Sequence, residues 1–216
     1  MNKSVLFKLE SGIATLTLNR PEKRNALNGE LVIDLLEQLE KVNNNPQIHI
    51  VILQANGKDF CAGADIHWLI GPNNDQAVKL LTDLFYKLQQ LNKPTIALIQ
   101  GNVYGGGLGL VACCDIGIAS STAIFCFPEV KLGLIPAIIA PYCIAAIGRR
   151  AAQHYFLTAE IFDSKEAYRI SLIQRIVEED NLLADGLLLA KKILDNKPEA
   201  VGLAKSLILK YNWNFL

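Results

Sequence analysis

Two segments of the chain combine small residues with a predicted change from strand to helix. The first, YGGGLGLVACCDIGIA at residues 104–119, places three consecutive glycines at the start of an apolar run that fits a helix or a buried strand. Glycine adopts backbone conformations closed to other residues and lets a second molecule approach the main chain. If residues 105–107 precede a helix, their free N–H groups favour a nearby anion or developing oxyanion. Tight packing of a strand against a helix is the alternative interpretation.

The second segment, GKDFCAGADIHWL at residues 57–69, also follows a predicted strand. It places the small residues Ala62, Gly63 and Ala64 before Asp65, which we interpret as a cap for a short helix. Two such turns can offer two N–H groups to one oxygen. Phe60 and Trp68 are interpreted as core residues, with the wall of a substrate pocket as the alternative.

A third segment, FCFPEVKLGLIPA at residues 125–137, carries Glu129 in a largely apolar stretch. Partial burial of a carboxylate raises its pKa, because burial disfavours the charged form, and so suits it to proton transfer near neutral pH. An ion pair between Glu129 and Lys131 is the alternative. Asp115 is interpreted as fixing the edge of a strand.

Other chemistries find little support in the residue pattern. Gly105 to Leu110 fails the dinucleotide pattern Gly-x-Gly-x-x-Gly at its sixth position, and the lysine of a Walker motif is missing. The five cysteines form no Cys-x-x-Cys and are interpreted as buried free thiols. The three histidines lack the spacing of metal ligands, so no metal is expected.

Composition restricts the class of partner. The 216 residues include 21 Lys plus Arg and 21 Asp plus Glu, so no overall field would attract nucleic acid or an anionic membrane surface. The N-terminal segment lacks the apolar core of a secretory signal, and no stretch approaches the length of a membrane span. We therefore expect a cytoplasmic protein without nucleic-acid or membrane partners.

Hydrophobic periodicity predicts an α/β chain. Residues 5–10 and 13–19 read as a hairpin, residues 28–42 as a helix with Asn28 as its cap, and residues 48–54 as a buried strand. A helix over 75–91 and a strand over 95–100 follow, and after the glycines the pattern is mostly helical. We expect one domain over residues 1–216, with an α/β core to about residue 145 and a helical part over about 146–216.

Four motifs in this order resemble the enoyl-CoA hydratase/isomerase (crotonase) superfamily: LNRPEKRNALN, FCAGADI, QGNVYGGGLGLVACCDI and FPEVKLGLIPA. The segment from residue 131 to 167 is most similar to the bacterial methylglutaconyl-CoA hydratase branch, which acts in leucine breakdown. The resemblance implies a spiral of repeated ββα units followed by a mostly helical C-terminal part that mediates assembly.

The resemblance also implies roles for individual residues. Ala64 and Gly106 match the two residues whose N–H groups form the family's oxyanion hole, and Glu129 matches a catalytic acid/base. Such an oxyanion hole stabilises the enolate that forms when water adds to an α,β-unsaturated thioester. The residues implied in binding the CoA ester are Ala64, Asp65, Ile66, His67, Gly106 and Arg24, with Lys23 as a further candidate for the CoA phosphates.

Gly109 departs from the family pattern, because standard hydratases have a first glutamate there. We expect a hydratase, of 3-methylglutaconyl-CoA in particular, that works through Glu129 with a water held by other groups such as Tyr104 or Tyr142. The alternatives are a single-glutamate enoyl-CoA isomerase, an acyl-CoA decarboxylase, or a CoA-ester binding protein without catalysis.

The resemblance carries expectations about cofactors and assembly as well. No metal or redox cofactor is expected, because CoA belongs to the substrate. A homo-oligomer, trimer or hexamer, is expected. The C-terminal part is expected to be shorter than in relatives, as is the loop near residue 71.

Overall fold

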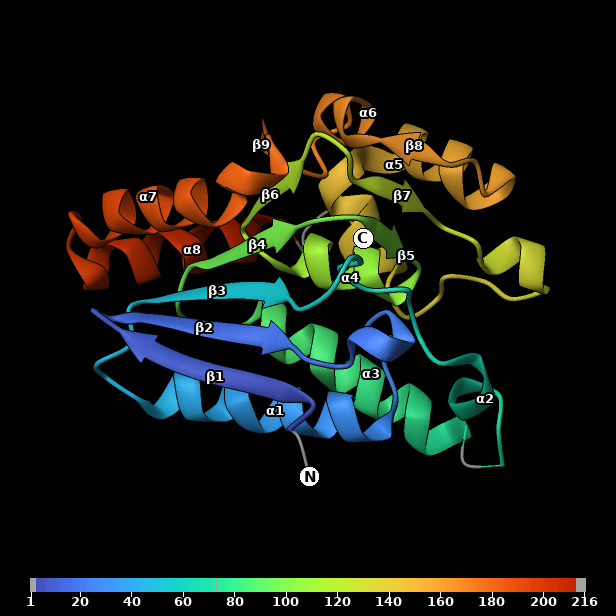
Figure 1. Cartoon of the computed structure of the whole chain (residues 1–216), viewed down its shortest axis with the longest axis horizontal. Coiled ribbons are helices and arrows are strands. Elements are labelled where there is room, and N and C mark those ends of the chain that lie inside the picture. The colour runs from blue at the N-terminus through green and yellow to red at the C-terminus, as the bar shows by residue number, and fades with distance from the viewer. Residues whose placement is uncertain (1–2, 73, 213–216) are drawn as a thin grey trace.

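The computed structural model describes residues 3–72 and 74–212, which form a mixed α/β fold built on two sheets (Figure 1). The larger sheet has the strand order β1-β2-β3-β4-β6-β9, and only its first pair is antiparallel. The smaller sheet has the order β5-β7-β8. The strands are Val5–Glu10 (β1), Ile13–Leu18 (β2), Ile50–Ala55 (β3), Thr95–Ile99 (β4), Asn102–Tyr104 (β5), Ile116–Ser120 (β6), Ile124–Cys126 (β7), Phe162–Asp163 (β8) and Arg175–Val177 (β9).

Helices connect the parallel strands, as parallel pairing requires a long crossover. The α-helices are Gly29–Asn44 (α1), Ile66–Leu69 (α2), Asn74–Gln89 (α3), Gly106–Cys113 (α4), Ala140–Thr158 (α5, kinked at Gly148), Ser164–Arg169 (α6), Leu182–Leu194 (α7) and Pro198–Asn212 (α8). Short 3₁₀ turns span Pro21–Lys23 (η1), Glu129–Leu132 (η2) and Glu179–Asn181 (η3).

The elements predicted before the glycines are confirmed. Strands β1 and β2 form an antiparallel hairpin that turns at Ser11 and Gly12. Asn28 caps α1, since its Oδ1 accepts a hydrogen bond of 3.0 Å from the Leu31 N–H. Helix α1 then presents an apolar face of Leu31, Leu35, Leu39 and Val42 to the core.

Alternate residues of the parallel strands pack into two separate cores. In β3, Val51 and Leu53 belong to the larger core, whereas Ile50 and Ile52 belong to the smaller one. Because side chains alternate across a strand, these two sets lie on opposite faces of the sheet. Helices α1 and α3 cover one face, and α7 covers the other (Figure 1). The central strands β3 and β4 are therefore buried on both faces, which explains why they read as continuous apolar runs, whereas the edge strand β1 is largely exposed.

The prediction that the chain is mostly helical after the glycines is confirmed, but the structure adds short strands that the sequence analysis did not predict. Strands β6 and β7 follow α4, and the short strands β8 and β9 extend the two sheets from within the helical part. Strands of two or three residues carry too few side chains for their period to be recognised. Their pairing with β7 and β6 depends on partners that are distant in the sequence.

Asp115 holds a strand edge, as predicted. Its Oδ2 accepts hydrogen bonds from the Thr95 N–H at 2.7 Å and from the Thr95 hydroxyl at 2.9 Å. The buried Lys205 of α8 donates to the same oxygen at 2.8 Å. This contact fastens α8 to the beginning of β4.

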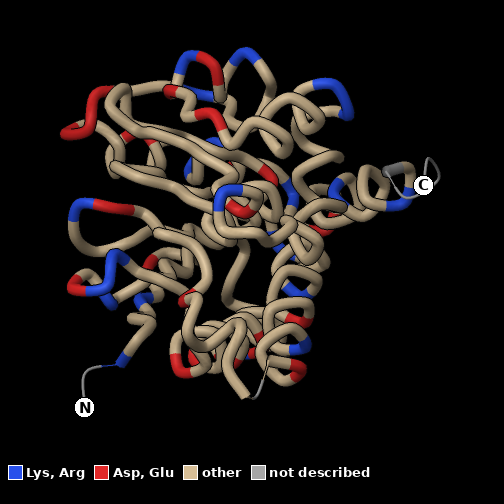
Figure 2. Tube along the Cα trace, turned by 90° about the vertical axis from the view of Figure 1, so that its right-hand side faces the viewer, with Lys and Arg blue, Asp and Glu red and all other residues tan. Residues whose placement is uncertain are grey.

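The cysteines and the charged residues agree with the sequence analysis. All five cysteines are free, four of them are buried, and burial raises the pKa of Cys61 to about 12. Basic and acidic residues are interspersed along the trace in the view of Figure 2. Within the described residues, none of the helices has both the length and the apolar character that a membrane crossing requires.

Candidate active site

Two turns bring the backbone N–H groups of Ala64 and Gly106 together. The first turn is held by hydrogen bonds from Leu27 N–H to Gly63 O and from Asp65 N–H to Leu27 O, both 2.8 Å. In the second, Gly105 N–H donates to Cys126 O at 3.1 Å, and Gly106 begins α4. The N–H groups of Ala64 and Gly106 donate to no other described residue. Two free donors thus lie at adjacent turns.

The space beside the Cα atoms of Gly63 and Gly106 is too small for a side chain. Gly63 has φ +93°, and a Cβ there would lie 2.9 Å from Tyr104 O and 3.5 Å from Gly106 N. A Cβ at Gly106 would lie 3.4 Å from Ala64 N. A side chain on either glycine would therefore press on the opposite turn. The glycines allow the two amides to approach one another, as a site for an oxyanion requires.

Glu129 faces this pair of turns from the beginning of η2. A Cβ at Gly105, where φ is +46°, would lie 3.0 Å from Glu129 Oε1. The second carboxylate oxygen, Oε2, is buried and has no hydrogen-bond partner among the described residues. Burial accordingly raises the pKa of Glu129 above its ordinary value of 4.5. A desolvated carboxylate with a raised pKa is suited to taking up and returning a proton.

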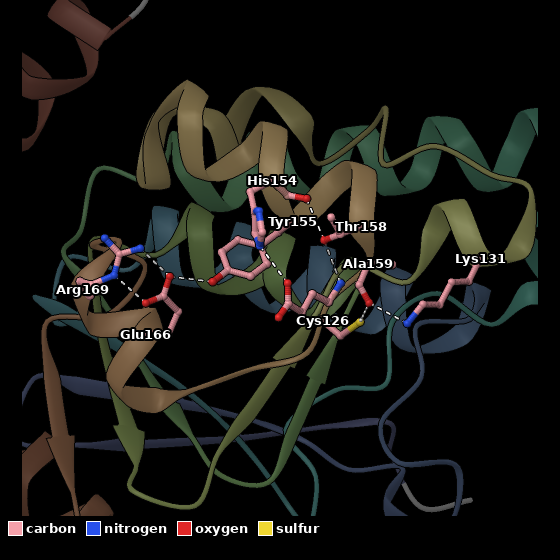
Figure 3. A network of polar contacts seen from close by, with 9 residues as sticks. Cys126, Lys131, His154, Tyr155, Thr158, Ala159, Glu166 and Arg169 are labelled. Carbon is pink, nitrogen blue, oxygen red and sulfur yellow. Dashed lines mark hydrogen bonds and ion pairs between the residues drawn. The ribbon is translucent and has the colours of Figure 1, made fainter.

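The alternative role of Glu129, an ion pair with Lys131, is wrong. Lys131 Nζ donates instead to Ala159 O at 2.8 Å (Figure 3). Glu166 on α6, by contrast, is a carboxylate with partners. It accepts a hydrogen bond of 2.6 Å from the Tyr155 hydroxyl and forms an ion pair with Arg169 (Figure 3). Tyr155, Glu166 and Arg169 thus form a closed structural network, whereas Oε2 of Glu129 has no hydrogen-bond partner in the part of the chain that the structure describes.

Ala64, Gly106 and Glu129 line one cavity of about 440 Å³. The remaining lining is almost entirely apolar and comes from α2, α3, and the segment that joins η2 to α5. These residues are Leu69, Ile70, Asn74, Val78, Leu81, Phe85, Gly133, Leu134, Ile135, Pro136, Ala137, Ile138 and Ile139. Sequence reasoning missed this wall, because the periodicity of α3 marks an apolar face without distinguishing core from cavity.

The other predicted binding residues lie outside this cavity. Asp65 stands at the cap position of α2, but its side chain makes no capping hydrogen bond and lies 3.9 Å from Arg20 Nη1. The predicted cap position is therefore confirmed, but the side-chain hydrogen bond that usually accompanies it is not formed. Ile66 and His67 are exposed on α2, and Arg24 is exposed at the end of η1. Their contact with CoA stays a prediction.

The aromatic residues divide between the core and its margin. Phe60 is buried in the core, as predicted, and Trp68 packs partly buried against the core. Tyr104 donates its hydroxyl to Asn102 Oδ1 at 3.2 Å, and the buried Tyr142 packs near Phe85 with ring centroids 6.1 Å apart. Neither tyrosine lines the cavity, and their role in holding a water stays a prediction.

A sequence profile described as Enoyl-CoA hydratase/isomerase matches residues 8–211. The chain belongs to this family. It is 35% identical over 210 residues to the short-chain-enoyl-CoA hydratase of Clostridium acetobutylicum, covering 95% of this chain and 80% of that protein. It is 32% identical to the crotonyl-CoA hydratase of Syntrophomonas wolfei, covering 94% of this chain and 80% of that protein.

Solved structures of family members have the same fold. A Legionella pneumophila protein of the enoyl CoA hydratase/isomerase (crotonase) group is 42% identical, with a TM-score of 0.92, and the match covers 99% of this chain and 85% of that one. The predicted crotonase fold is thereby confirmed. The names of these three relatives do not specify the methylglutaconyl branch, so only the superfamily resemblance is supported.

Proposed function

We propose that this family member is a hydratase that adds water to α,β-unsaturated CoA thioesters. The observation that carries the proposal is the convergence of two free amides and one desolvated carboxylate on a single apolar cavity. The names of relatives such as the Clostridium enzyme support the same reaction.

In the proposed reaction, the thioester oxygen accepts hydrogen bonds from the Ala64 and Gly106 N–H groups. The Glu129 carboxylate takes a proton from water while the water oxygen bonds to C3. The C2–C3 π electrons move toward the thioester, and the resulting enolate oxygen is held by the two amides. The protonated Glu129 then returns its proton to C2. Atoms and charge balance without a metal or a redox cofactor.

Glu129 serves both proton transfers in this scheme, because Gly109 offers no second carboxylate. A general acid or base contributes about 10²- to 10⁴-fold, so a single residue that performs both roles can support substantial turnover. The same groups could move a proton from C2 to C4 or assist decarboxylation. Those isomerase and decarboxylase alternatives, and a CoA-ester binding protein, are distinguished by the product.

The finer proposal, from the sequence resemblance, is 3-methylglutaconyl-CoA as the substrate in leucine breakdown. The distal carboxylate of this substrate would lack a cationic partner in the cavity, because the described lining contains no lysine, arginine or histidine. From the same resemblance we propose a homo-oligomer, trimer or hexamer, whose mass light scattering would measure. The cytoplasmic location is a proposal from the sequence composition.

The test is turnover of the purified protein with crotonyl-CoA, 3-methylcrotonyl-CoA, 3-methylglutaconyl-CoA and a 3-enoyl-CoA, with products separated by chromatography. Formation of a 3-hydroxyacyl-CoA supports the hydratase. Conversion of the 3-enoyl-CoA alone would indicate the isomerase, and release of CO₂ the decarboxylase. Binding of all four esters without conversion would indicate the binding protein.

A further inference from the structure

The space beside Gly109 is filled by two apolar side chains. A Cβ at Gly109 would overlap Cγ2 of Ile139 and lie 2.8 and 3.0 Å from two ring carbons of Phe85. Phe85 and Ile139 also line the cavity that contains Glu129. At the position where a two-carboxylate hydratase has its first glutamate, this protein therefore has an apolar wall. We call Phe85 and Ile139, packed over Gly109, the Gly109 wall.

The Gly109 wall is firmly supported by the core. Phe85 is 1% exposed and Ile139 is 4% exposed, and both belong to the larger core. Tyr142 packs near the Phe85 ring from the opposite element, α5. Side chains held in this way keep their positions when a ligand binds, because close-packed groups have little room to relax.

The Gly109 wall stands close to the reacting carbons of a bound acyl group. Gly106 and Gly109 are three residues apart in α4, so they lie on the same face of the helix about 5–6 Å apart. A thioester oxygen bound at the Gly106 N–H places C1 beside that residue. Carbon C3 lies two bonds further along the acyl chain, within reach of the Gly109 wall.

We propose that Phe85 and Ile139 are specificity-determining residues that select acyl groups with an apolar branch at C3. This inference rests on the proposed function, because it assumes that the thioester oxygen binds at Ala64 and Gly106. A methyl group on C3 gains apolar contact with the Gly109 wall. A hydrogen on C3 makes less of this contact, and a hydroxyl group finds no hydrogen-bond partner in the wall. One methyl group in an apolar pocket changes affinity by about tenfold or more.

The test measures the affinities of two saturated esters, 3-methylbutanoyl-CoA and butanoyl-CoA, which bind without being hydrated. Calorimetric titration gives the ratio of their dissociation constants for the wild type and for Phe85→Leu and Ile139→Ala. We expect the wild type to bind the branched ester about tenfold more tightly. Both variants should reduce this ratio at least threefold.

Leu88→Ala is the matched control. Leu88 lies one turn after Phe85 on α3 and is equally buried, but it does not line the cavity. Its loss should lower stability without changing the ratio. Circular dichroism of each variant establishes that the folded proteins are being compared.

The two proposals fail in different ways. Equal affinities of the wild type for the two esters would overturn the proposed selectivity of the Gly109 wall. So would a ratio of dissociation constants that Phe85→Leu and Ile139→Ala change no more than Leu88→Ala does. Absence of binding of both esters would overturn it too. Hydration of crotonyl-CoA without a preference for the branched ester would support the hydratase function and reject the selectivity proposed for the Gly109 wall. A preference for the branched ester without hydration of any enoyl-CoA would support the selectivity of the Gly109 wall and reject the hydratase function.

Discussion

The two sides of the cavity are built differently. On one side, the turns at Gly63 and Gly105 present backbone amides. A Cβ at Gly63 would lie 2.9 Å from Tyr104 O, and one at Gly105 would lie 3.0 Å from Glu129 Oε1, so both turns require glycine. On the other side, the side chains of Phe85 on α3 and of Ile139 immediately before α5 approach from elements far apart in the chain. Main-chain donors cannot be replaced by substitution, but side chains can. The difference indicates that the reaction depends on the first side, and the choice of acyl group on the second.

Glu129 stands between these two sides. Its position at the beginning of η2 is set by neighbouring residues in the sequence, since Pro128 precedes it and Gly133 ends the turn. Its raised pKa is a property of the assembled cavity, because burial is the main cause. The following substitutions test each side separately, beginning with the largest expected effect.

Glu129→Gln should reduce hydration about 10²- to 10⁴-fold, because the amide cannot take up the proton of water. Affinity for a CoA ester should change little, since size and position are retained. Steady-state hydration and calorimetric titration measure the two quantities. Glu160→Gln, at an exposed carboxylate that pairs with His154, is the control and should keep full turnover. Full turnover of Glu129→Gln with unchanged binding would disprove the assigned role.

Gly63→Ala should reduce kcat about 10²- to 10³-fold, the typical cost of losing an oxyanion donor. The new Cβ would press on Tyr104 O and displace the Ala64 amide. Gly148→Ala provides the control, because Gly148 also has a positive φ of +74° but no atom within 4 Å of its Cβ position. Comparable losses of kcat in the two variants would mean that backbone strain, rather than the amide, is responsible.

The pH dependence of hydration should follow the ionisation of Glu129. The base must be ionised, so kcat/KM should fall about tenfold for each pH unit below its pKa. Because burial raises that pKa, the midpoint should lie above 4.5. A pH series of initial rates gives the midpoint. An acidic limb that persists unchanged in Glu129→Gln would assign the titration to another group.

Gly109→Ala should destabilise the fold by about 1–3 kcal/mol, because the added methyl group overlaps Ile139 and Phe85. This cost exceeds the gain in helix propensity of about 1 kcal/mol. Gly202→Ala in α8, where a Cβ would meet only Asn92 O at 3.4 Å, should be neutral or slightly stabilising. Urea denaturation compares the two. Equal stability of both variants would show that the Gly109 wall yields easily.

The smallest effect expected is on the pH dependence of stability. A carboxyl whose pKa is raised by folding stabilises the protein below its unfolded pKa, and this contribution is lost as the pH rises through its folded pKa. The Tm of Glu129→Gln relative to the wild type should therefore be higher at pH 8 than at pH 5. Thermal unfolding at both pH values measures the difference. An unchanged difference would mean that the ionised carboxylate is well solvated.

The sequence determined the elements and the main-chain chemistry, because both depend on local patterns. The capping Asn28, the hairpin at Ser11 and Gly12, and the glycines near residue 106 were readable from spacing and from glycine's steric freedom. Glu129 was readable from its apolar neighbours. These predictions concern residues whose partners lie nearby in the chain.

Tertiary structure decided the short strands and the cavity wall. β8 and β9 exist only because β7 and β6 offer free edges, and Phe85 meets Ile139 only because α3 and α5 pack on α4. An apolar residue on an amphipathic helix has the same pattern whether it faces core or cavity. The family resemblance of the sequence therefore identified Gly109 as the place of a missing carboxylate, and only the packing around Gly109 identified what replaces that group.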